Sequence, residues 1–372
     1  MYIQTLNLAN FRNYETLHFE PSQGLNILFG QNAQGKSAIL ESIYLLATSK
    51  SHRTSHDLDM IRLGEPGARV QADVIRSARN DVSVEIILSR AEKKTIKINK
   101  VKHPKIGDIV GQLNAVIFSN SDIEMVKGEP SRRRRFLNLE VSQISPQYVY
   151  ALGRYKRVLD QRNNLLREIK MGSSSAYGLE VWDSQLVQYG AVVMARRAEF
   201  AAFLADAATY IYSVMTEHSE ELSISYKPNI DVGESDTEED ISRKFAAALA
   251  AKRELDIARG TTHTGPHRDD LLMSVNGLSA RDYASQGQQR TVAIAIKLAE
   301  IDIMQNAAGE TPVVLLDDIM AELDEGRRLR IFESTVGRCQ TLVTTAHLEE
   351  LHESIIGSAA VFEVKSGRVN LK

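Results

Sequence analysis

The stretch that decides the fold is Gly30-Gln-Asn-Ala-Gln-Gly-Lys36-Ser37, which matches the pattern G-x-x-x-x-G-K-[ST] at every fixed position. An apolar run from Leu25 to Phe29 precedes it, and a helical pattern follows it. The apolar residues that share one face of this pattern are Ile39, Leu40, Ile43 and Leu46. A glycine-rich loop between a buried strand and a helix predicts a phosphate-binding loop in an α/β fold.

The chemistry of a phosphate-binding loop depends on its backbone. Without side chains at Gly30 and Gly35, successive N–H groups can converge on a β-phosphate at the start of the helix. Lys36 adds a positive charge near the β- and γ-oxygens, and the Ser37 hydroxyl is placed to bind Mg²⁺. The residues predicted to bind the nucleotide are Gly30, Gln31, Asn32, Ala33, Gln34, Gly35, Lys36 and Ser37.

Composition limits the possible functions. The formal net charge of the 372 residues is -3, so any nucleic-acid surface must be a local feature. The single cysteine, Cys339, lies in a short apolar run and permits no disulfide within the chain. No apolar stretch is long enough to span a bilayer, and the first residues lack a signal-peptide pattern. We therefore expect a cytoplasmic protein without a membrane segment.

The spacing of apolar residues divides the chain into three parts. Short strand-like runs fill residues 1–125, and residues 295–372 have a βαβ rhythm of apolar runs with a helical pattern between them. The part between them, 126–294, is mostly helical. Two helical patterns within it, at 148–170 and 179–214, predict a helical hairpin. We expect the outer parts to form one nucleotide-binding lobe and the middle part a second lobe.

A second motif supports nucleotide chemistry. The run Pro312-Val-Val-Leu-Leu reads as a buried strand, and Asp317 and Asp318 follow at its carboxyl end, where open α/β sheets bind ligands. Asp317 is predicted to bind Mg²⁺, directly or through water. Asp318 is predicted to orient or deprotonate the attacking water. An apolar strand that ends in aspartate is common in proteins of many functions. In a chain that also has a phosphate loop, a strand that ends in two aspartates is much less often a chance feature and indicates a nucleotide site.

A third motif, Ser285-Gln-Gly-Gln288-Gln-Arg-Thr, opens a long amphipathic helical pattern. Ser285 and Gln288 have the spacing of a capping box, which by itself indicates only a well-formed helix start. A serine, a glycine and a glutamine at the positive end of a helix dipole can also contact a γ-phosphate from outside the loop.

These motifs together resemble those of the ABC-type ATPases. The signature motif of that class has the Ser-x-Gly-Gln core and completes the ATP site of the opposite subunit in a head-to-tail pair. The resemblance therefore implies a catalytic role for Ser285 and nucleotide contacts for Gly287 and Gln288. It also implies a D-loop at Ala321 to Asp324 and a catalytic switch histidine at His347. The implied fold is an α/β P-loop ATPase head with a mixed-sheet nucleotide-binding lobe and a mostly helical second lobe.

Within this class the chain is similar to the RecF family of bacterial recombination-mediator ATPases, which is related to SMC-like head domains. The similarity extends over essentially the whole chain, and the order and spacing of its motifs are specific. These motifs are LNLANFRNY, SKSHRTSHD, EPSRRRRFLN, HTGPHRDD, SQGQQRT and LLDDIMAELD.

Membership of that family implies an ATP-dependent DNA-binding protein that dimerises around two ATP molecules and helps RecR and RecO to load RecA at gapped DNA. The implied activity is weak, DNA-stimulated ATP hydrolysis. The implied ligands are ATP, Mg²⁺ and double-stranded DNA, including single-strand/double-strand junctions.

Three residues outside the main motifs are candidates for the same site. Arg53 follows the helix after the phosphate loop and could reach the γ-phosphate as a cis arginine finger, although a structural arginine fits equally well. Arg12 and Asn13 could lie near the base and the phosphates, or could simply form a turn. The Q-loop glutamine of the wider class is missing here, and Asn120 or Asp122 could substitute for it.

Two basic segments are candidates for DNA contact. Residues 154–170 carry six basic and two acidic side chains on one helical pattern, and such a stripe can follow phosphates without reading bases. The residues predicted to bind DNA are Arg154, Lys156, Arg157 and Arg162. The run Arg132 to Arg135 is better explained by a solvated face or by ion pairs within the chain.

Other interpretations of the motifs remain. His263 and His267 are four residues apart, but Gly265 and Pro266 interrupt a helix between them, so a structural loop is favoured over zinc. A transporter's nucleotide-binding subunit would share the phosphate loop, the signature and the carboxylates, but it would be shorter. A small-molecule kinase would share the loop and would not need the SQGQ helix.

Overall fold

The computed structural model describes residues 1–233, 235–319 and 323–372, and its chain forms two compact units. Unit 1 comprises Met1–Ile123, Ile211–His218 and Arg290–Lys372, and unit 2 comprises Glu124–Tyr210 and Ser219–Gln289. The boundaries predicted from the sequence, 125/126 and 294/295, each differ by a few residues from the boundaries of the two units in the structure. The sequence analysis also missed the segment Ile211–His218, because helical periodicity does not reveal which unit the end of a long helix packs against.

One six-stranded sheet of unit 1 is antiparallel and has the strand order β2-β1-β4-β5-β6-β7. Buried and exposed residues alternate along its longer strands, which places one face on the core. Its strands are β1 (Tyr2–Phe11), β2 (Tyr14–Phe19), β4 (Gly67–Ile75), β5 (Val82–Ser89), β6 (Thr95–Ile98) and β7 (Val101–His103).

The second sheet of unit 1 is mixed and has the order β15-β14-β3-β13-β12-β8, in which only β15 runs antiparallel to its neighbour. The first four residues of β8 and of β12 and all of β13 are buried, as expected of strands covered on both faces. The strands are β3 (Leu25–Phe29), β8 (Ala115–Ser119), β12 (Val313–Asp317), β13 (Thr341–Thr345), β14 (Ala359–Lys365) and β15 (Arg368–Leu371).

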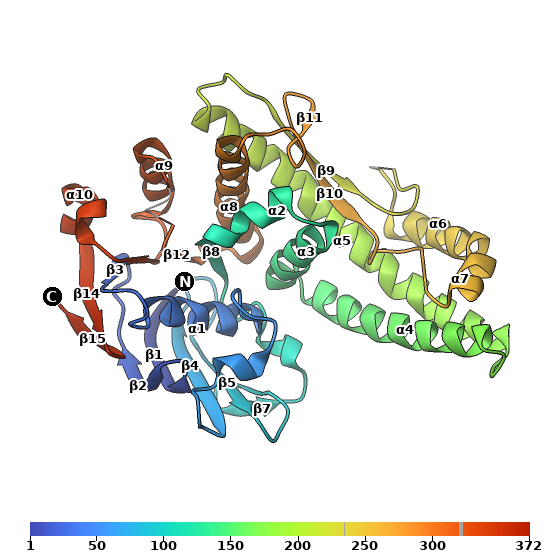
Figure 1. The fold of residues 1–372 in the computed structure, drawn as a ribbon, viewed down its shortest axis with the longest axis horizontal. Helices are drawn as coiled ribbons and strands as arrows, with labels where there is room; N and C mark the ends of the chain where they lie inside the picture. Colours follow the sequence, from blue (N-terminus) through green and yellow to red (C-terminus); the bar gives the residue numbers. More distant parts are fainter. Residues whose placement is uncertain (234, 320–322) are drawn as a thin grey trace. The chain divides into compact units, whose positions relative to one another are not determined.

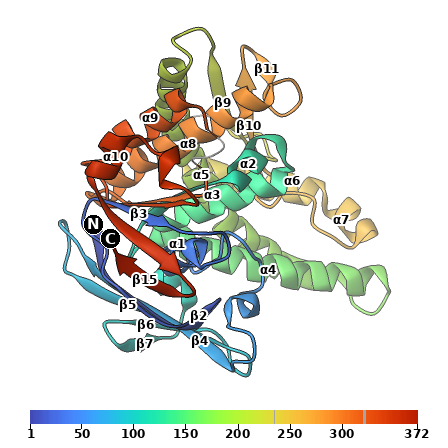
Figure 2. The same cartoon turned by 60° about the vertical axis from the view of Figure 1, so that its left-hand side comes forward.

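Helix α1 (Lys36–Thr48) packs between these two sheets (Figure 2). Its apolar residues share one hydrophobic core with β4 and β5 of the antiparallel sheet and with β12 and β13 of the mixed sheet. Every residue of α1 except Ser37 is buried. A helix buried on all sides cannot shift without opening the core around it, so the loop that precedes it is held firmly.

The other helices of unit 1 are short, apart from most of α8 (Gln286–Ala308). They are η1 (Asp57–Met60), η2 (Ile106–Ile109), η3 (Asn120–Asp122), α9 (Glu325–Thr335), η6 (Leu348–Glu350) and α10 (Glu353–Gly357). Among the helices of the described residues, none is long and apolar enough to cross a membrane.

Unit 2 is mostly helical and also contains a three-stranded antiparallel sheet, β11-β10-β9, which the sequence analysis did not predict (Figure 1). Helices α4 and α5 form the predicted hairpin (Figure 1). The elements are α2 (Ile123–Lys127), α3 (Pro130–Ile144), α4 (Pro146–Lys170), η4 (Ala176–Gly178), α5 (Leu179–Met215), β9 (Leu222–Lys227), α6 (Glu238–Ala251), α7 (Arg253–Arg259), β10 (Asp270–Val275) and β11 (Leu278–Ser279).

Helix α4 is amphipathic, and one of the four residues predicted to bind DNA lies on its buried face. Arg154, Lys156 and Arg157 are exposed, whereas Arg162 is fully buried. Its Nε donates to Asp183 (2.6 Å) and its Nη1 to Asp256 and Thr262 (2.8 Å each). The prediction that Arg162 binds DNA is therefore wrong. The exposed part of α4 still carries five basic residues, Arg154, Lys156, Arg157, Arg167 and Lys170, against two acidic ones, Asp160 and Glu168.

Replacement of Arg162 should destabilise the protein. Asp256 is itself fully buried, so Arg162→Met leaves a buried carboxylate without its cation. We expect the free energy of unfolding to fall by about 3–5 kcal/mol. The exposed Arg157→Met on the same helix is the matched control and should change it by less than about 0.5 kcal/mol. Urea unfolding followed by circular dichroism measures both, and equal midpoints for the two variants would contradict the structural role.

Candidate nucleotide-binding site

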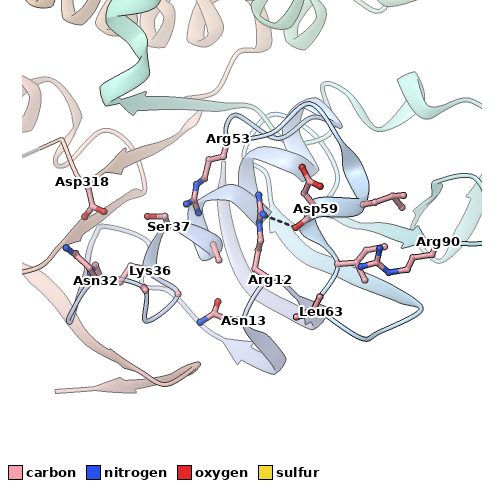
Figure 3. Close-up of a pocket in the computed structure, with 15 residues that line it drawn as sticks. Arg12, Asn13, Asn32, Lys36, Ser37, Arg53, Asp59, Leu63, Arg90 and Asp318 are labelled. Atoms are coloured by element: carbon pink, nitrogen blue, oxygen red, sulfur yellow. Dashed lines mark hydrogen bonds between the residues drawn. The ribbon is translucent and has the colours of Figure 1, made fainter.

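A cavity of about 800 Å³ opens in unit 1 around the loop between β3 and α1 (Figure 3). Residues from the phosphate loop, the first hairpin, the segment after α1 and the carboxyl end of β12 line it together. The lining residues are Arg12, Asn13, Asn32, Ala33, Gly35, Lys36, Ser37, Ala38, Arg53, Leu58, Asp59, Ile61, Leu63, Arg90 and Asp318. The structure thus brings together most of the residues that the sequence assigned to phosphate binding.

The phosphate loop has the backbone that its glycines predict. Gly35 has a φ of 115°, and a Cβ there would lie 2.7 Å from the side chains of Asn13 and Tyr14. Those side chains instead donate hydrogen bonds to the loop, from Asn13 Nδ2 to the Gln34 carbonyl (2.9 Å) and from the Tyr14 hydroxyl to the Gly35 carbonyl (3.2 Å). Asn13 therefore supports the loop from outside, which is a structural contribution to the site.

Lys36 lies over the loop in the position that a phosphate-binding lysine needs. Its side chain is buried, and Nζ donates to the carbonyls of Gly30 (2.5 Å) and Gln31 (3.0 Å). Lys36 and Ser37 begin α1, and the first turn of this helix has no acidic side chain. The positive end of the α1 dipole is thus left for an anion from outside the helix.

Asp317 lies at the carboxyl end of β12, beside the Ser37 hydroxyl, which donates a hydrogen bond to it. Burial by itself would raise the pKa of Asp317. Hydrogen bonds from His52, Ser37 and Thr344 outweigh that effect and hold the pKa below its ordinary value. Asp317 is therefore an anion at neutral pH. An ionised carboxylate next to a serine hydroxyl is a donor set that suits Mg²⁺.

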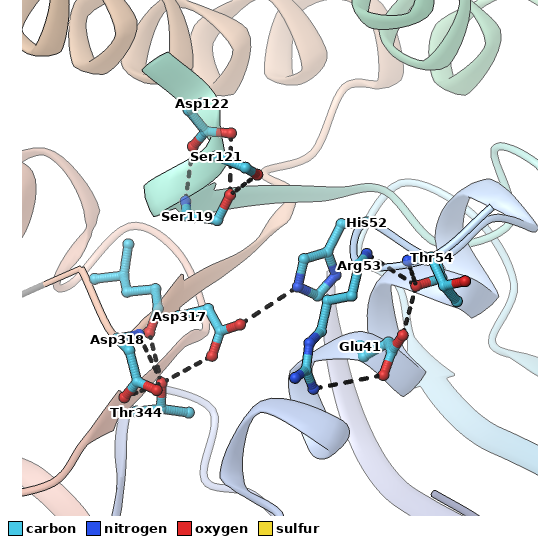
Figure 4. Close-up of polar contacts among 12 residues, drawn as sticks. Glu41, His52, Arg53, Thr54, Ser119, Ser121, Asp122, Asp317, Asp318 and Thr344 are labelled. Atoms are coloured by element: carbon cyan, nitrogen blue, oxygen red, sulfur yellow. Dashed lines mark hydrogen bonds and ion pairs between the residues drawn. The ribbon is translucent and has the colours of Figure 1, made fainter. Parts of the chain in front are cut away.

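Thr344 fixes both carboxylates, and the sequence analysis missed it. The Asp318 N–H donates to Thr344 Oγ1 (2.8 Å), and that hydroxyl lies 3.1 Å from Asp317 Oδ1 and 3.3 Å from Asp318 Oδ1 (Figure 4). Asp318 has a positive φ of 49°, an uncommon backbone for a residue other than glycine. Its side chain turns from the strand into the cavity, where it lines the wall (Figure 3).

His52 is a second residue of the site that the sequence analysis did not assign. Its Nε2 lies 3.3 Å from Asp317 Oδ2, and its ring packs edge-on against Tyr44 at a centroid distance of 5.7 Å. The side chain is largely buried. His52 thus donates to Asp317 on the side away from Thr344 (Figure 4).

Comparison with known proteins agrees with this geometry. The model of the RecF/RecN/SMC N-terminal domain family matches residues 2–369. The "DNA replication and repair protein RecF" of Shouchella clausii is 42% identical over 370 residues, which are 99% of this chain and 99% of that protein. The chain belongs to the RecF family. The protein of the same name from Geobacillus kaustophilus is 38% identical, over 99% of both chains.

Solved structures give the same result. A structure described as the "recombination mediator protein RecF-ATP in RecFOR pathway" superposes with a TM-score of 0.92 at 33% identity and covers 100% of this chain and 97% of that one. An Smc head domain from Pyrococcus furiosus superposes at 0.55 with 15% identity, covering 100% of this chain and 96% of that one, which is a likeness of fold alone. The predicted RecF resemblance and the ABC-type ATPase fold are confirmed. None of these relatives supports the transporter alternative.

The two residues predicted to replace the Q-loop glutamine, Asn120 and Asp122, lie in η3, directly after β8. Asp122 accepts hydrogen bonds from the N–H (2.7 Å) and the hydroxyl (3.2 Å) of Ser119, so its carboxylate caps the turn after β8 (Figure 4). Asn120 is exposed. Neither lines the cavity around the phosphate loop, so their contact with the γ-phosphate stays a prediction.

The family's signature motif lies at the start of α8, in unit 2. Ser285 and Gln288 form the predicted capping box, in which the Ser285 N–H donates to Gln288 Oε1 (2.8 Å) and the Gln288 N–H to Ser285 Oγ (3.2 Å). Gln288 also donates to Glu220 (2.8 Å). Ser285 is exposed and Gly287 is partly exposed, so both can be reached from outside the chain.

The two remaining motifs of the ABC class are the D-loop and the switch histidine, and the structure describes the D-loop only in part. The first two residues of the predicted D-loop, Ala321 to Asp324, lie outside the described residues. Its last residue, Asp324, caps α9 by accepting from the Arg327 N–H (2.9 Å). The predicted switch residue, His347, is exposed after β13, and its N–H donates to the Thr345 hydroxyl (3.3 Å).

The histidine pair of the HTGPHRDD segment has a structural role. His263 Nδ1 lies 2.9 Å from Asp256, and His267 lies between the Tyr155 hydroxyl (2.6 Å) and the Thr262 carbonyl (3.0 Å). Burial lowers the pKa of His267 to about 4, so it stays neutral. No cluster of three metal-ligating side chains occurs among residues 1–233, 235–319 and 323–372.

The arginine run at the start of α3 is likewise mostly engaged within unit 2. Arg133 forms a two-pronged pair with Asp270 (2.7 and 2.9 Å), and Arg134 donates to the Asp269 carbonyl (2.8 Å). Arg132 is exposed. This ion pair and this hydrogen bond favour the structural interpretation of the run over DNA contact.

Proposed function

We propose that this chain binds ATP with Mg²⁺ in the cavity around the phosphate loop, hydrolyses it slowly, and uses it to form a head-to-tail dimer that clamps DNA during replication-gap repair. In this proposal the dimer acts with RecR and RecO to load RecA. The carrying observation is the convergence of Lys36, Ser37 and the carboxylates Asp317 and Asp318 at one end of α1. The repair names of relatives that cover the whole chain support the biological role.

Roles within the site follow from position and charge. The loop N–H groups and Lys36 would bind the phosphates. Ser37 and Asp317 would hold Mg²⁺, which neutralises charge on the β- and γ-oxygens when bound. Asp318 projects into the cavity from the strand end and would orient the attacking water. Arg53 lines the same cavity and would meet the γ-phosphate.

The proposed dimer would explain the exposed signature motif. Ser285 and Gly287 lie at the start of α8, where a second chain can reach them. A ligand shifts an equilibrium only by its differential affinity for the two states, so ATP favours a dimer only if it contacts both chains. The γ-phosphate is the group that both the phosphate loop and a partner's signature motif would bind, and hydrolysis removes it.

The DNA surface is proposed on the exposed face of α4. Arg154 and Arg157 are neighbours one helical turn apart, and Arg154 also packs over the Tyr150 ring at 5.4 Å. An exposed basic stripe on one helix face can follow phosphates without reading base edges, which predicts weak sequence preference and strong salt dependence.

Two substitutions separate binding from hydrolysis. Lys36→Met should abolish nucleotide binding because it removes the charge beside the phosphates, whereas Asp318→Asn should preserve binding and slow hydrolysis at least tenfold. Fluorescent-nucleotide titration and phosphate release measure the two effects. Lys102→Met on β7, whose side chain is exposed, is the lysine control and should behave as wild type. Equal hydrolysis in wild type and both site variants would remove this assignment.

Ser285→Arg tests the dimer. The large cation at an exposed helix start should leave ATP binding by one chain nearly intact while it blocks ATP-induced dimerisation and hydrolysis together. Sedimentation velocity with and without ATP measures the dimer. Ser223→Arg, at another exposed serine of unit 2, should dimerise normally. Normal dimerisation and turnover by Ser285→Arg would refute the head-to-tail arrangement.

The double variant Arg154→Ala/Arg157→Ala tests the DNA surface. It should weaken binding to unrelated duplexes alike and flatten the salt dependence by up to about one unit per lost phosphate contact. Fluorescence anisotropy over a salt series gives the slope. Arg243→Ala on α6, whose side chain is 76% exposed, is the control that should leave the slope unchanged. If the slope of the double variant also stays unchanged, the DNA surface lies elsewhere.

A further inference from the structure

One fully buried carboxylate, Glu41, lies one helical turn beyond Ser37 on α1 and connects three parts of the cavity wall. It accepts two hydrogen bonds from Arg12, through Nε (2.8 Å) and Nη2 (2.6 Å). It also accepts a hydrogen bond from the Ser51 hydroxyl (2.5 Å). Nη1 of Arg53 lies 3.9 Å from Glu41 Oε2, the carboxylate oxygen that does not bind Ser51 (Figure 4). Neither the phosphate-loop pattern nor the roles proposed above involve Glu41.

Through Ser51, Glu41 also fixes the turn that carries Arg53. Ser51 Oγ accepts hydrogen bonds from the N–H groups of Arg53 (2.9 Å) and Thr54 (3.1 Å) while it donates to Glu41. Ser51 is itself buried. The backbone of Arg53 is therefore held by a chain of hydrogen bonds that begins at the buried carboxylate, although its side chain reaches the cavity.

The two arginines are held very differently. Arg12 is bound through all three guanidinium nitrogens, because Nη1 also donates to the Asp59 carbonyl (2.7 Å). Its side chain is 23% exposed. The side chain of Arg53 is 49% exposed, and its ion pair with Glu41 is long. An ion pair this long, with a half-exposed arginine, contributes little, so Arg53 can leave Glu41 easily while Arg12 cannot.

The charge balance around Glu41 allows Arg53 to move toward a ligand while Arg12 stays in place. Glu41 supplies one negative charge to two cations, and its bidentate pair with Arg12 already neutralises it. When Arg53 moves away, no buried charge is left unpaired. A phosphate oxygen in the cavity offers Arg53 a better partner than a carboxylate that is already satisfied.

We infer that Glu41 is a positioning residue that sets the preference of the cavity for a nucleoside triphosphate over a diphosphate. It holds Arg12 as a fixed part of the wall, and through Ser51 it presents Arg53 as the movable cation that meets the terminal phosphate. This inference rests on the proposed ATP site and adds to it a residue that touches neither the nucleotide nor Mg²⁺.

The test compares affinities for mant-ADP and for a mant-labelled non-hydrolysable ATP analogue, measured by fluorescence titration of the full chain. Arg53→Ala should lower the ratio of triphosphate to diphosphate affinity about tenfold, the size expected for one lost charge-assisted contact. Ser51→Ala and Glu41→Gln should each lower the same ratio, and Glu41→Gln should also weaken ADP binding because Arg12 loses its tether. The double variants with Arg53→Ala should show no further fall in the ratio, because both residues act through Arg53.

The control is a second buried carboxylate of unit 1. Glu310 precedes β12, at the opposite end of the strand from Asp317, and accepts from the Ser77 N–H (3.0 Å). Glu310→Gln should leave the ratio unchanged, which separates positioning from a general loss of stability. The inference would be overturned if Ser51→Ala left the ratio of triphosphate to diphosphate affinity unchanged. It would also be overturned if the effect of Ser51→Ala on this ratio added to that of Arg53→Ala. Ser51→Ala decides the test if Glu41→Gln does not fold. Wild-type binding by Lys36→Met would instead refute the ATP site itself.

Discussion

The nucleotide pocket depends on the burial of α1 between the two sheets of unit 1. The helix contributes apolar side chains to both sheets, and its first two residues, Lys36 and Ser37, lie at the edge of that core. The loop before it can adopt its uncommon backbone because the helix end cannot move to relieve it. Burial of Glu41 on the same helix has the same origin, since almost no position of α1 faces solvent. Helix α1 therefore determines both the packing of the core in unit 1 and the placement of the polar groups of the nucleotide pocket.

The parallel arrangement of β12 and β13 explains the carboxylate pair. Leu316 pairs with Val343, so the next residues along each strand, Asp317 and Thr344, are neighbours at the edge where both strands end. Burying a carboxylate is costly unless hydrogen bonds replace its hydration. Asp317 receives them from three directions, and its pKa falls despite its burial. The strand pairing thus keeps an anion where a divalent cation is expected, before any ligand arrives.

The parts of the site that the sequence predicted are local patterns. The phosphate loop, the Asp317–Asp318 pair and the Ser285–Gln288 capping box each occupy a few consecutive residues, and each has the expected geometry. The parts that the sequence missed join residues far apart in the chain. Thr344 is 27 residues from Asp317, and His52 is 265 residues from it. No spacing rule for one helix or one strand can predict such pairs.

Other errors had a signal in the sequence that was not used. Arg162 lies four residues from Val158 and from Leu166, which places it on the buried face of α4, and the charge count alone hid this. Leu222 and Ile224 alternate with exposed serines, the period of a strand, although the surrounding helices suggested otherwise. The hairpin of β14 and β15, which the sequence analysis did not predict, turns at Ser366 and Gly367, both with positive φ.

The division of the motifs between the two units sets a quantitative demand on the proposed dimer. The phosphate loop and carboxylates belong to unit 1, while Ser285 to Gln288 belong to unit 2. To change a monomer–dimer population from about 1:99 to 99:1 at a fixed chain concentration, a ligand must favour the dimer by about 8 kcal/mol, because two monomers combine in each dimer. A head-to-tail pair contains two nucleotides, so each γ-phosphate must supply about half of that amount. A few charge-assisted hydrogen bonds from a helix start to one phosphate are of this size. In the proposed dimer, the exposed serine and glycine at the start of α8 would therefore supply the part of the association free energy that depends on the γ-phosphate.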